Sequence, residues 1–84
     1  MNLKVSRATF HTAVKTANGT PETEFNIHSA KEHRRVKMEI DPKTGVLWCE
    51  QYDPKAEELV KWFVPGANIV QGVLYGSQEG NILD

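Results

Sequence analysis

The chain has 84 residues, and its 10 lysines and arginines against 11 aspartates and glutamates give a formal net charge of −1 at pH 7. This length predicts one domain, and 39% hydrophobic with 25% charged residues is usual for a soluble globular protein. The near balance of charge argues against a general polyanion-binding protein, which is usually basic overall. The N-terminal residues lack the apolar segment of a signal peptide, and no apolar run is long enough for a transmembrane helix.

The residues at the N-terminus predict a strand over 2–5 followed by a helix over 7–17. Ser6 suits the helix N-cap, and Asn18 with Gly19 suits its end. The apolar positions of the helix recur at spacings of three and four: Phe10, Ala13, Val14 and Ala17. Threonines are weak helix formers, so the alternative is a strand over 9–16 with Phe10, Thr12 and Val14 on one face.

The clearest local pattern is a β-hairpin over residues 35–52. The sequence Asp-Pro-Lys-Thr-Gly at 41–45 suits a four-residue loop in which Gly45 adopts a left-handed conformation. With that loop, Met38 faces Cys49 across the hairpin. The core face is then apolar throughout: Val36, Met38, Ile40, Leu47 and Cys49. Trp48 falls on the opposite face of the hairpin.

Three further strands are expected, over residues 23–29, 59–64 and 68–75. Pro65 ends the second of them, and Gly72 in the middle of the third suggests a bend or bulge. The side chains expected to face the interior are Val60, Trp62, Val64, Val70 and Leu74. Both of the last two strands also carry apolar residues on their second face, which is usual for strands covered on both sides. The cover is either the N-terminal helix, a strongly curved barrel, or a partner.

The leading functional hypothesis is a small non-enzymatic protein-binding module of the adaptor or inhibitor type. The partner is another protein or a second copy of the chain, and the candidate binding residues are Trp48, Tyr52, Phe63, Ile69, Val73 and Tyr75. The small size and plain composition are typical of an accessory protein of a bacterium or phage. No catalytic motif is present, and the histidines pair with no cysteine at the spacing of zinc ligands. We therefore expect no enzymatic activity, no metal and no cofactor.

The alternative hypothesis is a nucleic-acid-binding β-barrel that uses a basic segment at 31–37. Its cationic side chains are Lys31, Arg34, Arg35 and Lys37. Arginine is suited to phosphate, but such a charge run is more often a solvated loop and the polar face of a strand. The single cysteine, Cys49, excludes an intrachain disulfide, and we expect a cytoplasmic location.

Two segments resemble SH3 domains. Residues 62–70, Trp-Phe-Val-Pro-Gly-Ala-Asn-Ile-Val, resemble the end of such a domain, and residues 52–60 resemble its acidic loop. The resemblance implies ligand-binding positions at Tyr52, Trp62, Pro65 and Asn68. The two segments nearly touch here, whereas several strands separate them in the family, and Ile69 replaces a binding tyrosine.

Together these patterns predict a β-rich α+β domain over residues 1–76, with a flexible C-terminal tail over 77–84. Its N-terminal strand and short helix are followed by a curved antiparallel sheet or small SH3-like barrel of about five strands.

Overall fold

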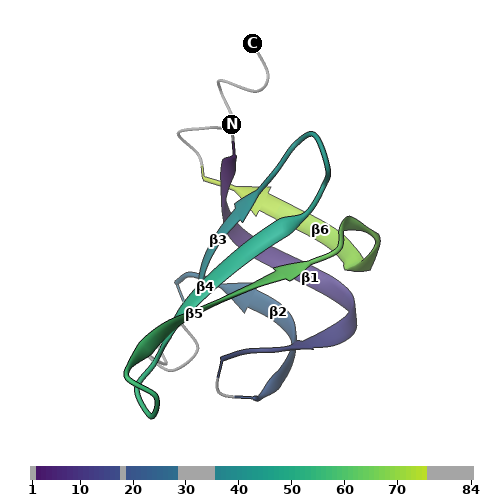
Figure 1. The fold of residues 1–84 in the computed structure, drawn as a ribbon. Coiled ribbons are helices and arrows are strands. Elements are labelled where there is room, and N and C mark those ends of the chain that lie inside the picture. The colour runs from purple at the N-terminus through teal and green to yellow at the C-terminus, as the bar shows by residue number, and fades with distance from the viewer. Residues whose placement is uncertain (1, 18, 29–35, 76–84) are drawn as a thin grey trace.

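A computed structural model describes residues 2–17, 19–28 and 36–75 as one antiparallel sheet with a single short helical turn (Figure 1). The elements are β1 (Leu3–Lys15), β2 (Pro21–Asn26), β3 (Lys37–Ile40), β4 (Leu47–Asp53), β5 (Glu58–Val64), the 3₁₀ turn η2 (Gly66–Asn68) and β6 (Ile69–Leu74). The β-rich domain is confirmed, although the described part of the sheet has six strands rather than about five. Nowhere in the described ranges does a helix have the length and apolar character needed to cross a membrane.

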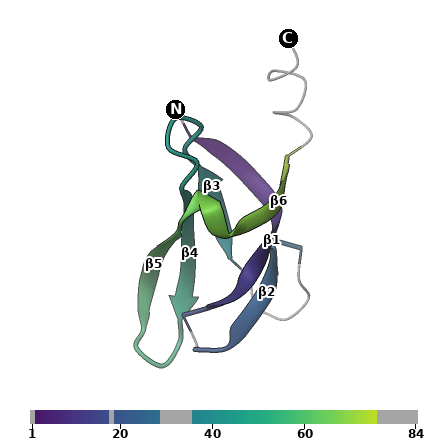
Figure 2. The ribbon, with the colours of Figure 1, turned by 90° about the vertical axis from the view of Figure 1, so that its right-hand side faces the viewer.

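The 13-residue strand β1 organises the sheet because it pairs with three other strands. The strand order is β2-β1-β3-β4-β5, and β6 joins β1. Residues Arg7 to Thr9 pair with β2 and with β6 at the same time, so these two strands lie on opposite edges of β1. The first residues of β1, Leu3 to Val5, pair with β3. The sheet is open, because β5 and β6 do not pair with each other. Figure 2 shows the three-stranded part β3–β4–β5 standing beside β1, β2 and β6.

The predicted helix over residues 7–17 is wrong, and the strand alternative is the observed one. Ala8 and Phe10 are buried and the intervening Thr9 is not, which is the period of a strand. Threonine and valine suit a pleated strand better than a helix, and hydrogen-bonded partners on both edges favour the extended chain. Thr12, expected on the same face as Phe10, is exposed, because the register with β2 shifts between Thr9 and Val14.

The predicted hairpin is confirmed in its register and in its turn. Met38 pairs with Cys49, Ile40 pairs with Leu47, and Gly45 has a φ of +73°. Four of the five residues expected on the core face are buried, namely Val36, Met38, Leu47 and Cys49, while Ile40 is half-buried against them. Trp48 points to the other side, as expected.

The centre of the core is an aromatic cluster that draws on three strands. Phe25 of β2 contacts Phe10 of β1 edge to face, with ring centroids 5.0 Å apart, and Trp62 of β5 with centroids 6.0 Å apart. The buried side chain of Gln51 accepts a hydrogen bond from the backbone N–H of Ala17 at 2.9 Å, which ties the residues after β1 to β4. Residues that are distant in the sequence thus pack together in one core.

The strand β6 departs from a regular alternation at two places. Its register with β1 shifts between Thr9 and Phe10 and again between Val5 and Arg7. Ile69 therefore pairs with Phe10 and packs against the core, whereas Val70, expected inside, is 56% exposed. The other four residues expected inside do face the core side, Val64 fully buried and Val60, Trp62 and Leu74 half-buried. The two shifts flank Gly72, in agreement with the predicted bend or bulge.

The side chain of Asn68 extends the pairing of β1 and β6 beyond the strand itself. Its Oδ1 accepts a hydrogen bond from the N–H of Thr12 at 2.8 Å, and its Nδ2 donates to the carbonyl of Thr12 at 3.0 Å. The amide thus takes the place of a backbone peptide. This pair of bonds fixes the end of η2 against β1, where Thr12 has no partner in β2.

Two glycines meet where the β3–β4 turn packs on η2. A Cβ on Gly66 would lie 2.8 Å from the carbonyl oxygen of Gly45, which is closer than a carbon atom can approach. We expect Gly66→Ala to cost about 1–3 kcal/mol of unfolding free energy, because two backbone segments must separate. We expect Gly45→Val to cost about 1 kcal/mol or more, because a β-branched residue resists positive φ.

Urea denaturation followed by circular dichroism measures both changes. Lys43→Ala, at an exposed position of the same turn, is the matched control and should leave the midpoint almost unchanged. A Gly66→Ala midpoint equal to that of the control would show that the turn and η2 are not in contact.

Candidate docking face

The strands β3, β4 and β5 present one face to the core and the other away from it. We call the second the outer face; it consists of alternate residues of the three strands, namely Lys37, Glu39, Trp48, Glu50, Tyr52, Leu59, Lys61 and Phe63. Glu50 is half-buried and the others are exposed. The alternation of strand side chains explains why this face is continuous.

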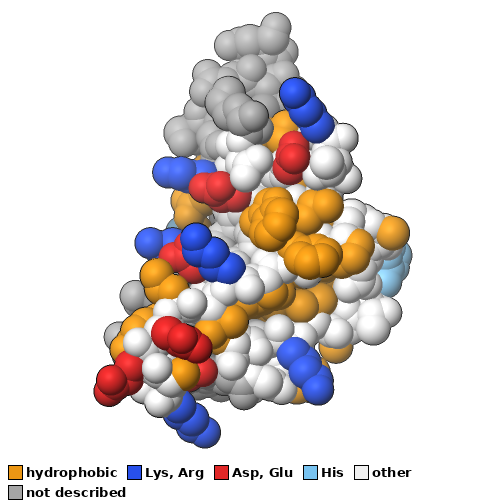
Figure 3. All heavy atoms as spheres, viewed as in Figure 1, with side chains coloured by type: hydrophobic (Ala, Val, Ile, Leu, Met, Phe, Trp, Pro, Cys, Tyr) orange, Lys and Arg blue, Asp and Glu red, His pale blue; other side chains and the backbone are white. Residues whose placement is uncertain are grey.

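The aromatic part of the outer face is a pair formed by Trp48 and Phe63. The two residues are directly opposite each other on β4 and β5, with ring centroids 5.6 Å apart and planes inclined by 52°. Trp48 is 47% and Phe63 58% exposed. Tyr52 and Leu59 form a second exposed pair farther along the same strands. Figure 3 shows hydrophobic side chains gathered over β4 and β5. The expectation that an N-terminal helix covers this face is wrong, since residues 7–15 form part of β1.

A row of alternating charge crosses the outer face between the two apolar pairs. Lys37, Glu50 and Lys61 are successive neighbours across β3, β4 and β5. Opposite charges at directly paired positions favour this register. The row also places the side chains of Lys37 and Lys61 on the same face of the sheet as Trp48.

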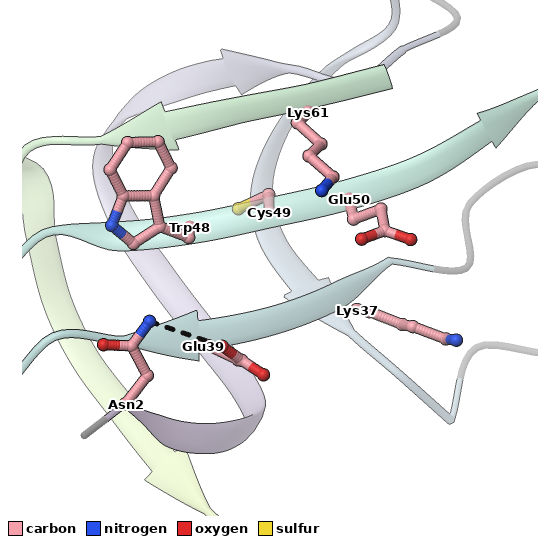
Figure 4. Close-up of a pocket in the computed structure, with 7 residues that line it drawn as sticks. All are labelled: Asn2, Lys37, Glu39, Trp48, Cys49, Glu50 and Lys61. Carbon is pink, nitrogen blue, oxygen red and sulfur yellow. Dashed lines mark hydrogen bonds between the residues drawn. The ribbon is translucent and has the colours of Figure 1, made fainter. Parts of the chain in front are cut away.

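A depression of about 430 Å³ opens where the aromatic pair meets the charged row (Figure 4). Its lining residues are Asn2, Lys37, Glu39, Trp48, Cys49, Glu50 and Lys61. Asn2 donates a hydrogen bond from Nδ2 to Oε2 of Glu39 at 3.3 Å, which places the N-terminal residues at its rim. Figure 4 shows Glu50 between Lys61 and Lys37 at one end of the depression and the Trp48 indole toward the other end. The depression therefore offers one apolar wall and charged groups of both signs.

The six residues predicted to bind a partner do not all reach this face. Trp48, Tyr52 and Phe63 lie on it, whereas Ile69 packs against the core. Val73 is half-buried on β6, where its carbonyl accepts a hydrogen bond from Ser6 Oγ at 3.0 Å. Tyr75, also half-buried, directly follows β6, which pairs with β1 and not with β4 or β5.

The sequence interpretation missed several members of the face, although a signal for them was present. Leu59 and Lys61 alternate with Phe63, so the strand pattern already put all three on one side. Glu39 and Glu50 follow from the hairpin register in the same way. The contribution of Asn2 has no sequence signal, because it depends on the pairing of β1 with β3.

Only part of the basic segment and of the SH3-like positions lies on the outer face within the described residues. Lys37 is exposed on the outer face, while Lys31, Arg34 and Arg35 lie outside the described residues. Of the positions that the SH3 resemblance implied, Tyr52 is on the outer face. Trp62 points to the other side of the sheet and packs against Phe25.

Two groups of reactive side chains bear on possible chemistry, the potential metal ligands and the single thiol. Across the described ranges, no three histidines, cysteines or carboxylates gather as a metal site. Cys49 is buried, and burial raises the pKa of its thiol to about 12 because the thiolate loses its hydration. A protonated thiol is a poor nucleophile.

The raised pKa of Cys49 predicts a loss of stability in alkali. The folded state favours the neutral thiol, so its contribution is fully present below the ordinary thiol pKa of 9.0 and disappears as pH rises toward about 12. We expect the stability advantage of the wild type over Cys49→Ala to shrink above that lower pKa by up to about 1.4 kcal/mol per pH unit. Urea denaturation of both proteins over this range measures the difference. An advantage that stays constant would contradict burial of the thiol.

Comparison with known proteins identifies no relative: no protein-family model matches the chain, and no curated protein or solved structure is significantly similar to it.

Proposed function

We propose that the chain is a non-enzymatic protein-binding module, of the adaptor or inhibitor type, that docks a partner on its outer face. The observation that carries this proposal is the exposed pair of Trp48 and Phe63 beside a depression with charged walls. Exposed apolar side chains that are packed together and rimmed by polar residues are typical of interaction sites.

Tryptophan is the residue type most enriched among interface residues that dominate binding energy. Trp48 is held in place by its contact with Phe63 on a rigid strand pair, so little conformational entropy is lost when it is covered. Lys37, Glu50 and Lys61 lie next to it and supply orientation through charge. The partner that fits is a protein surface with an apolar side chain flanked by charges of both signs.

We further propose that the fold is a small barrel of the SH3-like type. Its support is the connection of elements: a three-stranded meander, β3–β4–β5, leads through a 3₁₀ turn into a last strand that pairs with the first. The proposed docking face shares Tyr52 with the positions that the resemblance implied, whereas Trp62 packs against Phe25 and the side-chain amide of Asn68 is hydrogen-bonded to Thr12. The buried, unpaired Cys49 suits a reducing compartment such as the cytoplasm.

The experiment is affinity capture from nuclease-treated lysate with wild-type protein, Trp48→Ala and the control Val70→Ala. Val70 is as exposed as the aromatic pair but lies on β6. We expect a protein that the wild type and Val70→Ala retain and that Trp48→Ala loses. With that partner purified, Trp48→Ala should weaken binding at least about thirtyfold, which corresponds to about 2 kcal/mol. Equal capture by all three proteins would refute docking on the outer face.

A second candidate function is the binding of single-stranded nucleic acid. The observation in its favour is that Lys37 and Trp48 line the same depression. There, a base would stack on the indole and a phosphate would contact the ammonium group. Glu39 and Glu50 in that depression oppose it by repelling phosphate.

Titration of tryptophan fluorescence with a single-stranded oligonucleotide tests this second function. Affinity must fall steeply as salt rises, through counterion release, and the double change of Arg34 and Arg35 to Glu must abolish binding without unfolding the protein. Absence of binding at low salt would refute it.

A further inference from the structure

The free edge of β5 stands out among the edges of the described sheet. The order β2-β1-β3-β4-β5 leaves β2 and β5 at its two ends, and Figure 2 shows β5 flanked by β4 on one side only. β2 carries Pro21, Glu22 and Glu24, and proline with charge discourages strand addition. β6, which among the described strands pairs with β1 alone, has register shifts near both of its ends.

In contrast, β5 has seven residues without proline and with a regular register to β4 throughout. Its charged residues are Glu58 at its start and Lys61 in its middle, and the others are apolar on both faces, with Leu59 and Phe63 exposed on the outer face and Val60 and Trp62 half-buried on the core side. An added strand would cover side chains on both faces and also satisfy the backbone groups of the edge.

We propose that a second copy of this chain adds to that edge, β5 against β5, in an antiparallel two-fold pair centred on Trp62. Residues paired across the two strands must point to the same face of the sheet. The two-fold axis therefore passes between one residue and the same residue of the other copy. Centring on Lys61 would bring two ammonium groups together. Centring on Val60 would place the carboxylate of Glu58 on the core side against Trp62.

Centring on Trp62 meets neither obstacle. Lys61 then faces Phe63 of the other copy on the outer face, where an ammonium group over an aromatic ring is favourable. Val60 faces Val64 and Trp62 faces its own counterpart on the core side. The ladder then runs from Val60 to Val64, and Pro65 falls just beyond its end, opposite Leu59. A centre on Phe63 would instead bring Pro65 into the ladder opposite Lys61, and proline lacks the N–H that pairing needs.

The axis is perpendicular to the sheet, so both copies present the outer face on the same side. The two Trp48–Phe63 pairs then form one surface, linked across the axis by Lys61. The dimer goes beyond the proposed docking function, because it concerns the edge of the sheet and a partner of identical sequence.

Disulfide trapping tests the register. Two variants, Lys61→Cys and Phe63→Cys, are oxidised separately and as a mixture; Val70→Cys, exposed on β6, is the control. The proposed pair places residue 61 of one copy opposite residue 63 of the other. We expect the mixed disulfide to exceed either homodimer at least tenfold, and Val70→Cys to remain uncrosslinked. Dominant crosslinking of Lys61→Cys with itself would overturn this register, and crosslinking no greater than that of the control would overturn the pairing.

Sedimentation equilibrium of the purified chain tests the dimer itself. The wild type should reach twice the monomer mass as its concentration rises. Phe63→Lys, which places a lysine opposite Lys61, should weaken association at least tenfold, and Lys61→Glu added to it should restore association. Trp48→Ala should abolish binding of the docked partner and leave dimerisation unchanged. Failure of the docking proposal can therefore be distinguished from failure of the dimer proposal. A wild type that stays monomeric at every concentration refutes the dimer. This holds even if the β5 edge is found to bind a strand of another protein.

Discussion

Replacing Phe25 with alanine is expected to destabilise the domain by about 3–5 kcal/mol, because a large buried side chain is removed and its cavity cannot collapse. Phe25 is 2% exposed and contacts both Phe10 and Trp62. A domain of this size has a total stability of about 4–13 kcal/mol, so the variant should lose a large share of its stability. Circular dichroism with urea denaturation measures the change.

Phe63→Ala is the matched control, since it makes the same chemical change on the outer face. Its expected cost is about 1 kcal/mol or less, the contribution of one cross-strand aromatic contact. If Phe25→Ala does not fold at all, Phe25→Leu keeps the comparison measurable with an expected cost below about 1.5 kcal/mol. Equal losses for Phe25→Ala and Phe63→Ala would mean that the outer face is core, and the docking proposal would fail with it.

The two tryptophans provide the second large contrast. Trp62→Ala should cost about 3 kcal/mol, because its ring packs against Phe25 and the rest of the core. Trp48→Ala should cost about 1 kcal/mol or less, since its main described contact is the exposed ring of Phe63. Each variant leaves a single tryptophan, so fluorescence reports on one side of the sheet at a time.

The single remaining tryptophan gives an independent readout of burial. In Trp48→Ala, the emission of Trp62 should shift to longer wavelength on unfolding, because a partly buried indole becomes hydrated. In Trp62→Ala, the emission of Trp48 should already resemble that of a hydrated indole before urea is added. The reverse pattern would mean that the two faces of the sheet have been exchanged.

The hairpin of β3 and β4 could be predicted from sequence alone, including its partners and the outward direction of Trp48. The sequence information that specifies the hairpin is local, because the turn sequence sets the loop length and the alternation of residues sets the two faces. The pairing of Met38 with Cys49 and the positive φ of Gly45 followed directly. The apolar second face of β5 was predicted for the same reason.

The docking face was predicted only in part. The strand pattern put Leu59, Lys61 and Phe63 on one side, and the hairpin did the same for Trp48 and Tyr52. That these sets lie on one surface depends on the register of β4 with β5, which pairs Trp48 with Phe63. The turn between those strands contains Glu57 at a φ of +54°, a residue that carries no sequence signal for that conformation.

By itself, the sequence determined the β-rich character, the β3–β4 hairpin and the apolar alternation of β5, because turn chemistry and a period of two act between neighbours. Only the tertiary structure decided the secondary structure of residues 7–17 and which side chains of β6 are buried. The apolar spacing of residues 7–17 fits a helix, but β1 gains hydrogen-bonded partners in β2, β3 and β6 as a strand. In β6, register shifts turn Ile69 inward and Val70 outward. Such shifts arise from fitting two strands around one core; Gly72 indicates where the strand is irregular, but nothing in the local sequence specifies which residues turn inward.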